Sequence, residues 1–165
     1  MKLKYLNHYP QHLQHQIKEL IEKDKLSVYI LSKYPQKHTY QSDIALYDYT
    51  QDFKNQYLKK QTLSKVVYDG KINVIHDALG VHTFISRVQG GKLKAKNEIR
   101  IGTVFKNMPE AFLRMIVVHE LAHFKEKEHN KAFYNFCQHI EPSYHQLEFD
   151  LRVYLTYVDG GGKLY

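Results

Sequence analysis

One apolar segment that contains polar groups constrains the fold of this sequence more than any other feature. Residues 107–124 read NMPEAFLRMIVVHELAHF and are apolar around most of a helical circumference, which predicts a buried helix. Asn107 is a candidate N-cap, Pro109 fits the first turn, and Glu110 completes an Asn-x-x-Glu capping pattern. Burying an unpaired polar group costs about 1 to 3 kcal/mol, so something must satisfy the His and Glu side chains of this helix.

The polar groups of this helix follow a His-Glu-x-x-His pattern. His119 and His123 are one helical turn apart on the same face, so both imidazoles can bind one metal ion at about 2.0 to 2.1 Å. Glu120 lies roughly 100° further around the helix, beside the ion, where its carboxylate can accept a proton from an attacking water. The spacing therefore predicts a hydrolytic metal site with Glu120 as the catalytic residue.

A catalytic zinc site needs a third protein ligand and one open position. His129 is our candidate, but in an unbroken helix it would lie about 9 Å along the axis from His123. The helix must therefore end between Phe124 and Glu128, and Asn130 can cap a new helix after the break. Other side chains stay open as the third ligand, Glu148 first among them: His139, His145, Glu148 and Asp150.

The chain before the metal motif predicts helices followed by a small mixed sheet. Residues 1–62 have helical spacing in three segments, near Pro10, over 24–34 and after Ser42, which can cap the third. Residues 63–106 change to short β-branched runs between turn signals, which are typical of strands. The expected strands are 66–68, 72–75, 81–88 and 98–105, with an exposed basic loop from Gly90 to Lys96.

The chain after the sheet returns to helical spacing. Residues 107–158 should hold the metal-binding helix and the C-terminal helices, and 159–165 should form a tail made loose by Gly160 to Gly162. With no linker to divide it, the whole chain, 1–165, is expected to be a single α+β domain.

Three further side chains carry specific predictions. Cys137 is the only cysteine, which excludes an internal disulfide and a thiolate cluster, and its place on an apolar helix face predicts a buried structural thiol. Tyr144 and His145 are candidate donors to the negative charge that develops in a hydrolytic transition state.

Composition narrows the setting in which the protein works. No apolar run approaches the roughly 20 residues of a membrane-spanning helix, and the first residues lack the pattern of a secretory signal. We therefore expect a cytoplasmic protein with no membrane partner, and its oligomeric state is unknown from the sequence. The net charge of +7 favours contact with polyanions such as nucleic acid.

Three stretches carry a resemblance to a known family: "VVHELAHFKEKEHNKAFY", "FISRVQGGKLKAKNEIRIG" and "MPEAFLRMIVV". The histidine spacing also matches the metzincin proteases, but these have Gly where this chain has Glu126 and need a later methionine, whereas none follows Met115. The chain instead resembles the YgjP-like metallopeptidases, relatives of the WLM and SprT-like zinc peptidases in the zincin superfamily. The resemblance covers about residues 65–155.

This resemblance implies a zincin-like fold that binds one Zn2+ through His119, His123 and His129, with Glu120 as the catalytic acid and base. The implied function is peptide-bond hydrolysis by metal-activated water, on a peptide or protein substrate. It also implies that the strand from Glu98 runs along the cleft and that its edge pairs with an extended peptide. The edge residues are Glu98, Arg100 and Gly102.

Two alternatives remain open. SprT-like and WLM relatives act on proteins attached to DNA, and a basic loop beside the cleft would suit a DNA-associated protease. Its residues are Lys92, Lys94, Lys96 and Arg100. The other alternative is a zinc-stabilised protein-binding module without turnover, although such a module has no use for Glu120.

Overall fold

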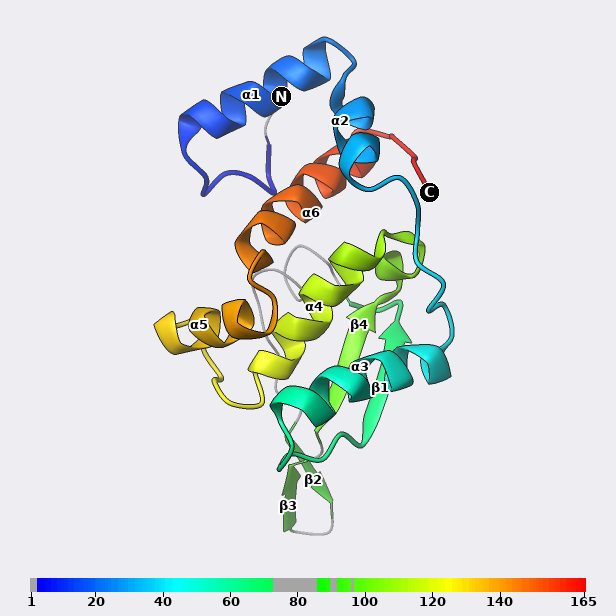
Figure 1. Cartoon of the computed structure of the whole chain (residues 1–165), viewed down its shortest axis with the longest axis vertical. Helices are drawn as coiled ribbons and strands as arrows, with labels where there is room; N and C mark the ends of the chain where they lie inside the picture. The colour runs from blue at the N-terminus through cyan, green and yellow to red at the C-terminus, as the bar shows by residue number, and fades with distance from the viewer. Residues whose placement is uncertain (1–2, 73–85, 90–91, 96) are drawn as a thin grey trace.

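The computed structural model describes residues 3–72, 86–89, 92–95 and 97–165. Within these residues a central helix lies between a parallel strand pair on one side and a long C-terminal helix on the other (Figure 1). This arrangement confirms the predicted α+β class. The helices are α1 (Gln11–Glu22), α2 (Leu26–Lys33), α3 (Asp43–Tyr57), α4 (Glu110–Ala122), α5 (Lys131–Ile140) and α6 (Tyr144–Asp159).

The N-terminal helices form close to where their spacing predicts them. α1 begins directly after Pro10, whose backbone carbonyl accepts the first helical hydrogen bonds. α3 begins after Ser42, whose side chain accepts a hydrogen bond from the backbone N–H of Ala45 at 3.1 Å. Leu46 on α3 and Ile30 on α2 are buried, so both helices turn their apolar faces into the core.

The described strands form two separate pairs, where the sequence predicts one mixed sheet. β1 (Lys65–Asp69) and β4 (Glu98–Gly102) are parallel, whereas β2 (Ser86–Gln89) and β3 (Lys92–Ala95) are antiparallel. The prediction of a basic loop is therefore wrong at Lys92–Ala95, which is a strand. Of the strands predicted at 72–75 and 81–88, residues 73–75 and 81–85 lie outside the described residues, as do Gly90, Gly91 and Lys96. Residues 86–88 are part of β2.

The expected strand 98–105 is wrong at its end. β4 stops at Gly102, and the chain continues as a short 3-10 helix, η2 (Thr103–Asn107). Over so few positions the spacing of apolar residues does not distinguish a strand from a 3-10 helix. Phe105 is completely buried in η2. η2 brings the chain from the sheet to the start of α4.

α4 is the centre of the hydrophobic core, as its sequence predicts. Its apolar residues from Phe112 to Ala122 are completely or almost completely buried, and the helix contacts β4, α3, α5 and α6. The predicted cap is wrong: Asn107 ends η2, Met108 is extended, and Pro109 precedes the first helical residue without any side-chain cap. The Asn107 amide oxygen instead accepts a hydrogen bond from Gln41 at 3.2 Å.

The C-terminal helices confirm the predicted layout, but the tail differs. α6 packs against α4 and buries Leu147 and Leu151. The N–H of Gly162 donates to the carbonyl of Tyr157 at 3.0 Å, and the Tyr165 hydroxyl donates to the carbonyl of Tyr34 at 2.5 Å. The tail is thus attached to the helices instead of loose, because its terminal aromatic ring finds partners. None of the helices in the described part of the chain is long and apolar enough to cross a membrane.

Candidate metal centre

Three histidine side chains converge at the C-terminal end of α4. The Nε2 atom of His123 lies 3.2 Å from Nε2 of His119 and 3.0 Å from Nε2 of His129. His119 and His123 are buried, and His129 is half-buried. Among the described residues, these three are the set of potential ligands whose donor atoms lie within 4.8 Å of one another.

The geometry of these nitrogens fits a metal ion. Ligand nitrogens about 2.0 to 2.1 Å from a tetrahedral zinc ion are roughly 3.3 to 3.4 Å apart, close to the two distances observed. Without a cation or a proton between them, imidazole lone pairs directed at one another repel. The three histidines can therefore hold a metal ion.

The second ring nitrogen of two of these histidines has a defined partner. Nδ1 of His119 lies 2.7 Å from the hydroxyl oxygen of Tyr144, and Nδ1 of His123 lies 3.0 Å from the backbone carbonyl oxygen of Glu126. Such contacts fix the orientation of a metal-binding imidazole and decide which of its nitrogens carries the proton. The rings are also held by Phe133, whose centroid lies 5.0 Å from that of His119 and 4.5 Å from that of His123.

The helix breaks before His129 as the sequence predicts, but α4 ends at Ala122, slightly earlier than the expected window from Phe124 to Glu128. α4 ends at Ala122, whose carbonyl accepts the N–H groups of Lys125 and Glu126 in a final turn. α5 begins after Asn130, whose side chain accepts a hydrogen bond from the N–H of Phe133 at 2.8 Å. No Gly or Pro is needed, because the Asn130 cap starts the next helix and turns the chain back.

Glu120 lies on α4 beside the first ligand. It is partly exposed, and the removal of water from around it raises the pKa of its carboxyl group to about 8. A cation held by the neighbouring histidines would favour the ionised form of this carboxyl group, in which it can accept a proton from an attacking water. The catalytic role of Glu120 stays a prediction.

The four alternative ligands have other partners. The Glu148 carboxylate lies 3.1 Å from the Arg152 guanidinium, and Asp150 accepts hydrogen bonds from side chains of α2. His139 lies edge-to-face on Tyr57 with 5.6 Å between ring centroids, and the exposed His145 lies 5.3 Å from Tyr134. The structure thus brings His129, and none of these four, to within ligand distance of His119 and His123.

The remaining predicted site residues are placed as follows. The Tyr144 hydroxyl faces Nδ1 of His119, on the opposite side of the ring from the three Nε2 atoms. The oxyanion roles of Tyr144 and His145 stay predictions.

In β4, Glu98, Arg100 and Gly102 align with β1, and Arg100 lies 3.1 Å from the Asp69 carboxylate. One edge of β4 is therefore used by β1, and the pairing of a substrate with this strand also stays a prediction.

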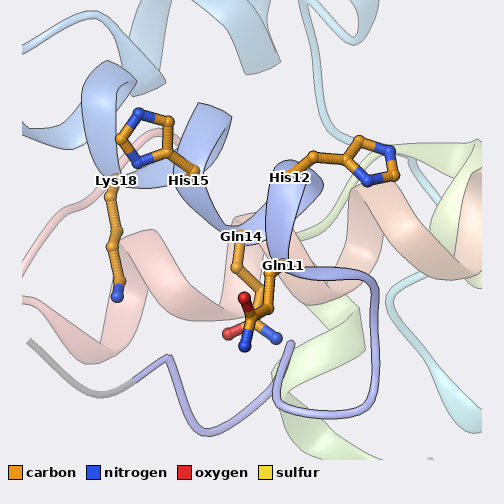
Figure 2. Close-up of a pocket in the computed structure, with 5 residues that line it drawn as sticks. All are labelled: Gln11, His12, Gln14, His15 and Lys18. Atoms are coloured by element: carbon orange, nitrogen blue, oxygen red, sulfur yellow. The ribbon is translucent and has the colours of Figure 1, made fainter.

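A surface hollow on α1 contains none of the predicted site residues (Figure 2). His12 and His15 border it, but their rings point away from each other, which does not suit a shared metal ion. Its lining residues all come from α1: Gln11, His12, Gln14, His15 and Lys18. The histidines that converge at the C-terminal end of α4, and not this hollow, define the candidate site.

Comparison with known proteins shows the family of this chain. The model of the family described as "YgjP-like, metallopeptidase domain" matches residues 34–154, a span that includes the three histidines and Glu120. A protein of Escherichia coli (strain K12) named "UTP pyrophosphatase" is 59% identical over 160 residues, which cover 96% of each chain. The chain therefore belongs to the YgjP-like family, and it has the metal-binding geometry of a hydrolase. No solved structure matches it.

Proposed function

We propose that this protein is a zinc-dependent hydrolase that cleaves UTP into UMP and pyrophosphate. The convergence of three imidazole nitrogens beside Glu120 carries the proposal, because it supplies a metal position and a proton acceptor for water. The identity of 59% over nearly the whole chain with a protein named "UTP pyrophosphatase" supports the choice of substrate.

The charges of the site suit a phosphoanhydride substrate. Three neutral imidazole ligands leave the charge of a divalent cation uncompensated, and the chain carries a net charge of +7. A nucleoside triphosphate is strongly anionic, so a cationic site both attracts it and offsets the charge that develops on its leaving group.

When bound, zinc lowers the pKa of a coordinated water and neutralises charge on a phosphoryl oxygen. Glu120 accepts one proton of the attacking water at a carboxylate oxygen. The water oxygen forms a bond to the α-phosphorus, and the bond from this phosphorus to the bridging oxygen breaks. Pyrophosphate leaves with the bridging oxygen, and Glu120 can return the proton to it, so that UTP and water are converted to UMP and pyrophosphate.

Peptide hydrolysis is the second candidate function. The family description contains the words "metallopeptidase domain", and the His-Glu-x-x-His arrangement is equally suited to the attack of water on a peptide carbonyl. In that case β4 would guide an extended substrate, and Glu120 would pass its proton to the leaving amine.

Parallel assays of the zinc-loaded protein with UTP and with a fluorogenic peptide library distinguish the two functions. We expect release of pyrophosphate from UTP, and a loss of about 100-fold or more in Glu120→Gln with zinc still bound. Glu128→Gln is the matched control, because Glu128 is an exposed glutamate of the same segment. Peptide cleavage without UTP cleavage would support the second candidate, and full activity of Glu120→Gln would contradict both.

A further inference from the structure

His38 lies in the segment between α2 and α3 and is almost completely buried. Its backbone N–H donates to the carbonyl of Met108 at 3.0 Å, and its Nε2 atom lies 2.7 Å from the carbonyl oxygen of Phe105. Two residues later, the backbone N–H of Tyr40 donates to Nδ1 of His38 at 2.9 Å. We call residues 38–41 the strap, because these contacts attach them to η2 and to the residue after it.

The contacts of the His38 ring require a neutral imidazole with its proton on Nε2. A carbonyl oxygen only accepts, so Nε2 must carry the proton and donate to Phe105. A backbone N–H only donates, so Nδ1 must offer its lone pair to Tyr40. A proton on Nδ1 would set two N–H groups against each other and break this hydrogen bond. The closed strap is therefore compatible only with neutral His38.

The surroundings of His38 oppose a positive charge on its ring. Burial lowers the pKa of His38, and the hydrogen bond to Phe105 and the charge of Glu110 on α4 offset this only in part. The Glu110 carboxylate already accepts hydrogen bonds from Tyr49 of α3 and Arg114 of α4. The strap, its neighbours in the chain and the elements packed against it carry further titratable side chains: Lys37, Tyr40, Asp43, Tyr68 and Lys106.

We propose that His38 is a pH-operated latch, which holds the strap on η2 while its imidazole is neutral and releases the strap when the imidazole is protonated. The strap also contacts η2 through Gln41, whose side chain donates to the carbonyl of Lys106 at 3.3 Å. Release therefore frees η2, which connects β4 to α4. None of the contacts named here involves a predicted metal ligand, so the latch is independent of the metal centre.

The direction of the pH effect follows from the two states of the strap. In the released strap His38 is in water and has its ordinary pKa of about 6.5, whereas in the closed strap its pKa is lower. The closed state is thus fully favoured above about pH 6.5. Each pH unit below that value favours release by up to about tenfold, until the pH passes the lower pKa of the closed state.

Hydrogen–deuterium exchange of the zinc-loaded protein, followed by mass spectrometry, tests the latch. After correction for the intrinsic exchange rate, a peptide that covers the strap should exchange about five- to tenfold faster at pH 5.5 than at pH 7.5. This dependence should disappear in His38→Asn, because an Asn side chain can accept from the N–H two residues later but does not titrate. His12→Asn removes an exposed histidine of α1 and is the matched control, which should behave as the wild type. All three proteins keep the same metal ligands, so any loss of zinc at pH 5.5 affects them equally.

An NMR titration of the wild type does not depend on how well a variant folds. The His38 ring should stay neutral, with its proton on Nε2, at pH values where exposed histidines are already charged, and it should gain a proton together with loss of protection at the Tyr40 amide. The proposal is overturned if His38 titrates at its ordinary pKa while the strap stays protected, or if His38→Asn keeps the wild-type pH dependence. Neither measurement uses UTP, so this failure is distinct from a failure of the proposed function.

Discussion

Asp150 is a single buried residue that joins two helices of the fold. Its carboxylate on α6 accepts hydrogen bonds from four side chains, and it is almost completely buried. Tyr34 and Lys33 each donate to Oδ2 at 2.6 Å, and Tyr29 and Gln146 donate to Oδ1 at 3.0 and 3.1 Å. This set of donors fixes α2, and the segment after it, against α6.

We expect Asp150→Asn to lower the free energy of unfolding by about 1 to 3 kcal/mol, because an amide nitrogen would then face the donors of Lys33 and Tyr34. The low end applies if solvent screens the partly exposed lysine. Urea denaturation measures the change. Asp48→Asn, an exposed change on α3, should stay within about 0.5 kcal/mol, and an equal effect of both variants would contradict the role given to Asp150.

Cys137 should be chemically inert in the native protein. It is completely buried, and burial raises the pKa of its thiol to about 12, so thiolate is scarce at pH 8. We expect iodoacetamide to label the native protein far more slowly than the protein in urea, as followed by mass spectrometry. Equally rapid labelling in both conditions would show that the thiol is accessible.

Some roles of single residues follow from sequence, and others need the folded chain. Spacing alone places His119 and His123 on one face of a helix. It leaves the choice between His129 and Glu148 open, because that choice depends on a turn of several residues. The contact between the Tyr144 hydroxyl on α6 and Nδ1 of His119 on α4 could not be predicted, since no sequence pattern specifies how side chains of different helices meet.

At the scale of elements, the cap of α5 determines where the third histidine lies. Asn130→Ala should lower stability by about 1 kcal/mol and weaken zinc binding, because the loss of the cap frees the turn that carries His129. Ser42→Ala removes an equivalent cap from α3, away from the metal centre. It should cost about the same stability and leave zinc affinity unchanged. Thermal unfolding and chelator competition measure both effects, and equal zinc affinity in the two variants would contradict the prediction.

Elements were predictable where one local signal decides their form. Ser42 and Asn130 act as caps as expected, because each accepts a hydrogen bond from an N–H group three residues later. Asn107 has the same sequence signal but lies in η2, because the chain must first turn from the sheet. The lysines of Lys92–Ala95 favour an exposed loop, but this segment pairs with β2 across two residues and forms β3. The Gly-Gly pair between the two segments is a hairpin signal that the charge pattern concealed.

At the scale of the whole molecule, zinc should stabilise the fold, because the three histidine ligands come together only in the native state. Zinc at 100 times its dissociation constant adds about 2.7 kcal/mol. For a chain of this size that corresponds to a rise in Tm of about 5 to 10 °C. Differential scanning fluorimetry with and without a chelator should show this shift in the wild type and in His139→Ala. It should show little of it in His129→Ala, and an unchanged shift in that variant would exclude His129 as a ligand.

The most direct test of the proposed catalytic centre is the hydrolysis of UTP in water enriched in oxygen-18, followed by phosphorus-31 NMR. The zinc-loaded wild type should produce UMP and pyrophosphate, with the label in the phosphate of UMP, because water attacks the α-phosphorus. Glu120→Gln should retain about one zinc ion per chain and lose this activity by about 100-fold or more. Label in the pyrophosphate, release of inorganic phosphate with UDP, or an active Glu120→Gln would contradict the account.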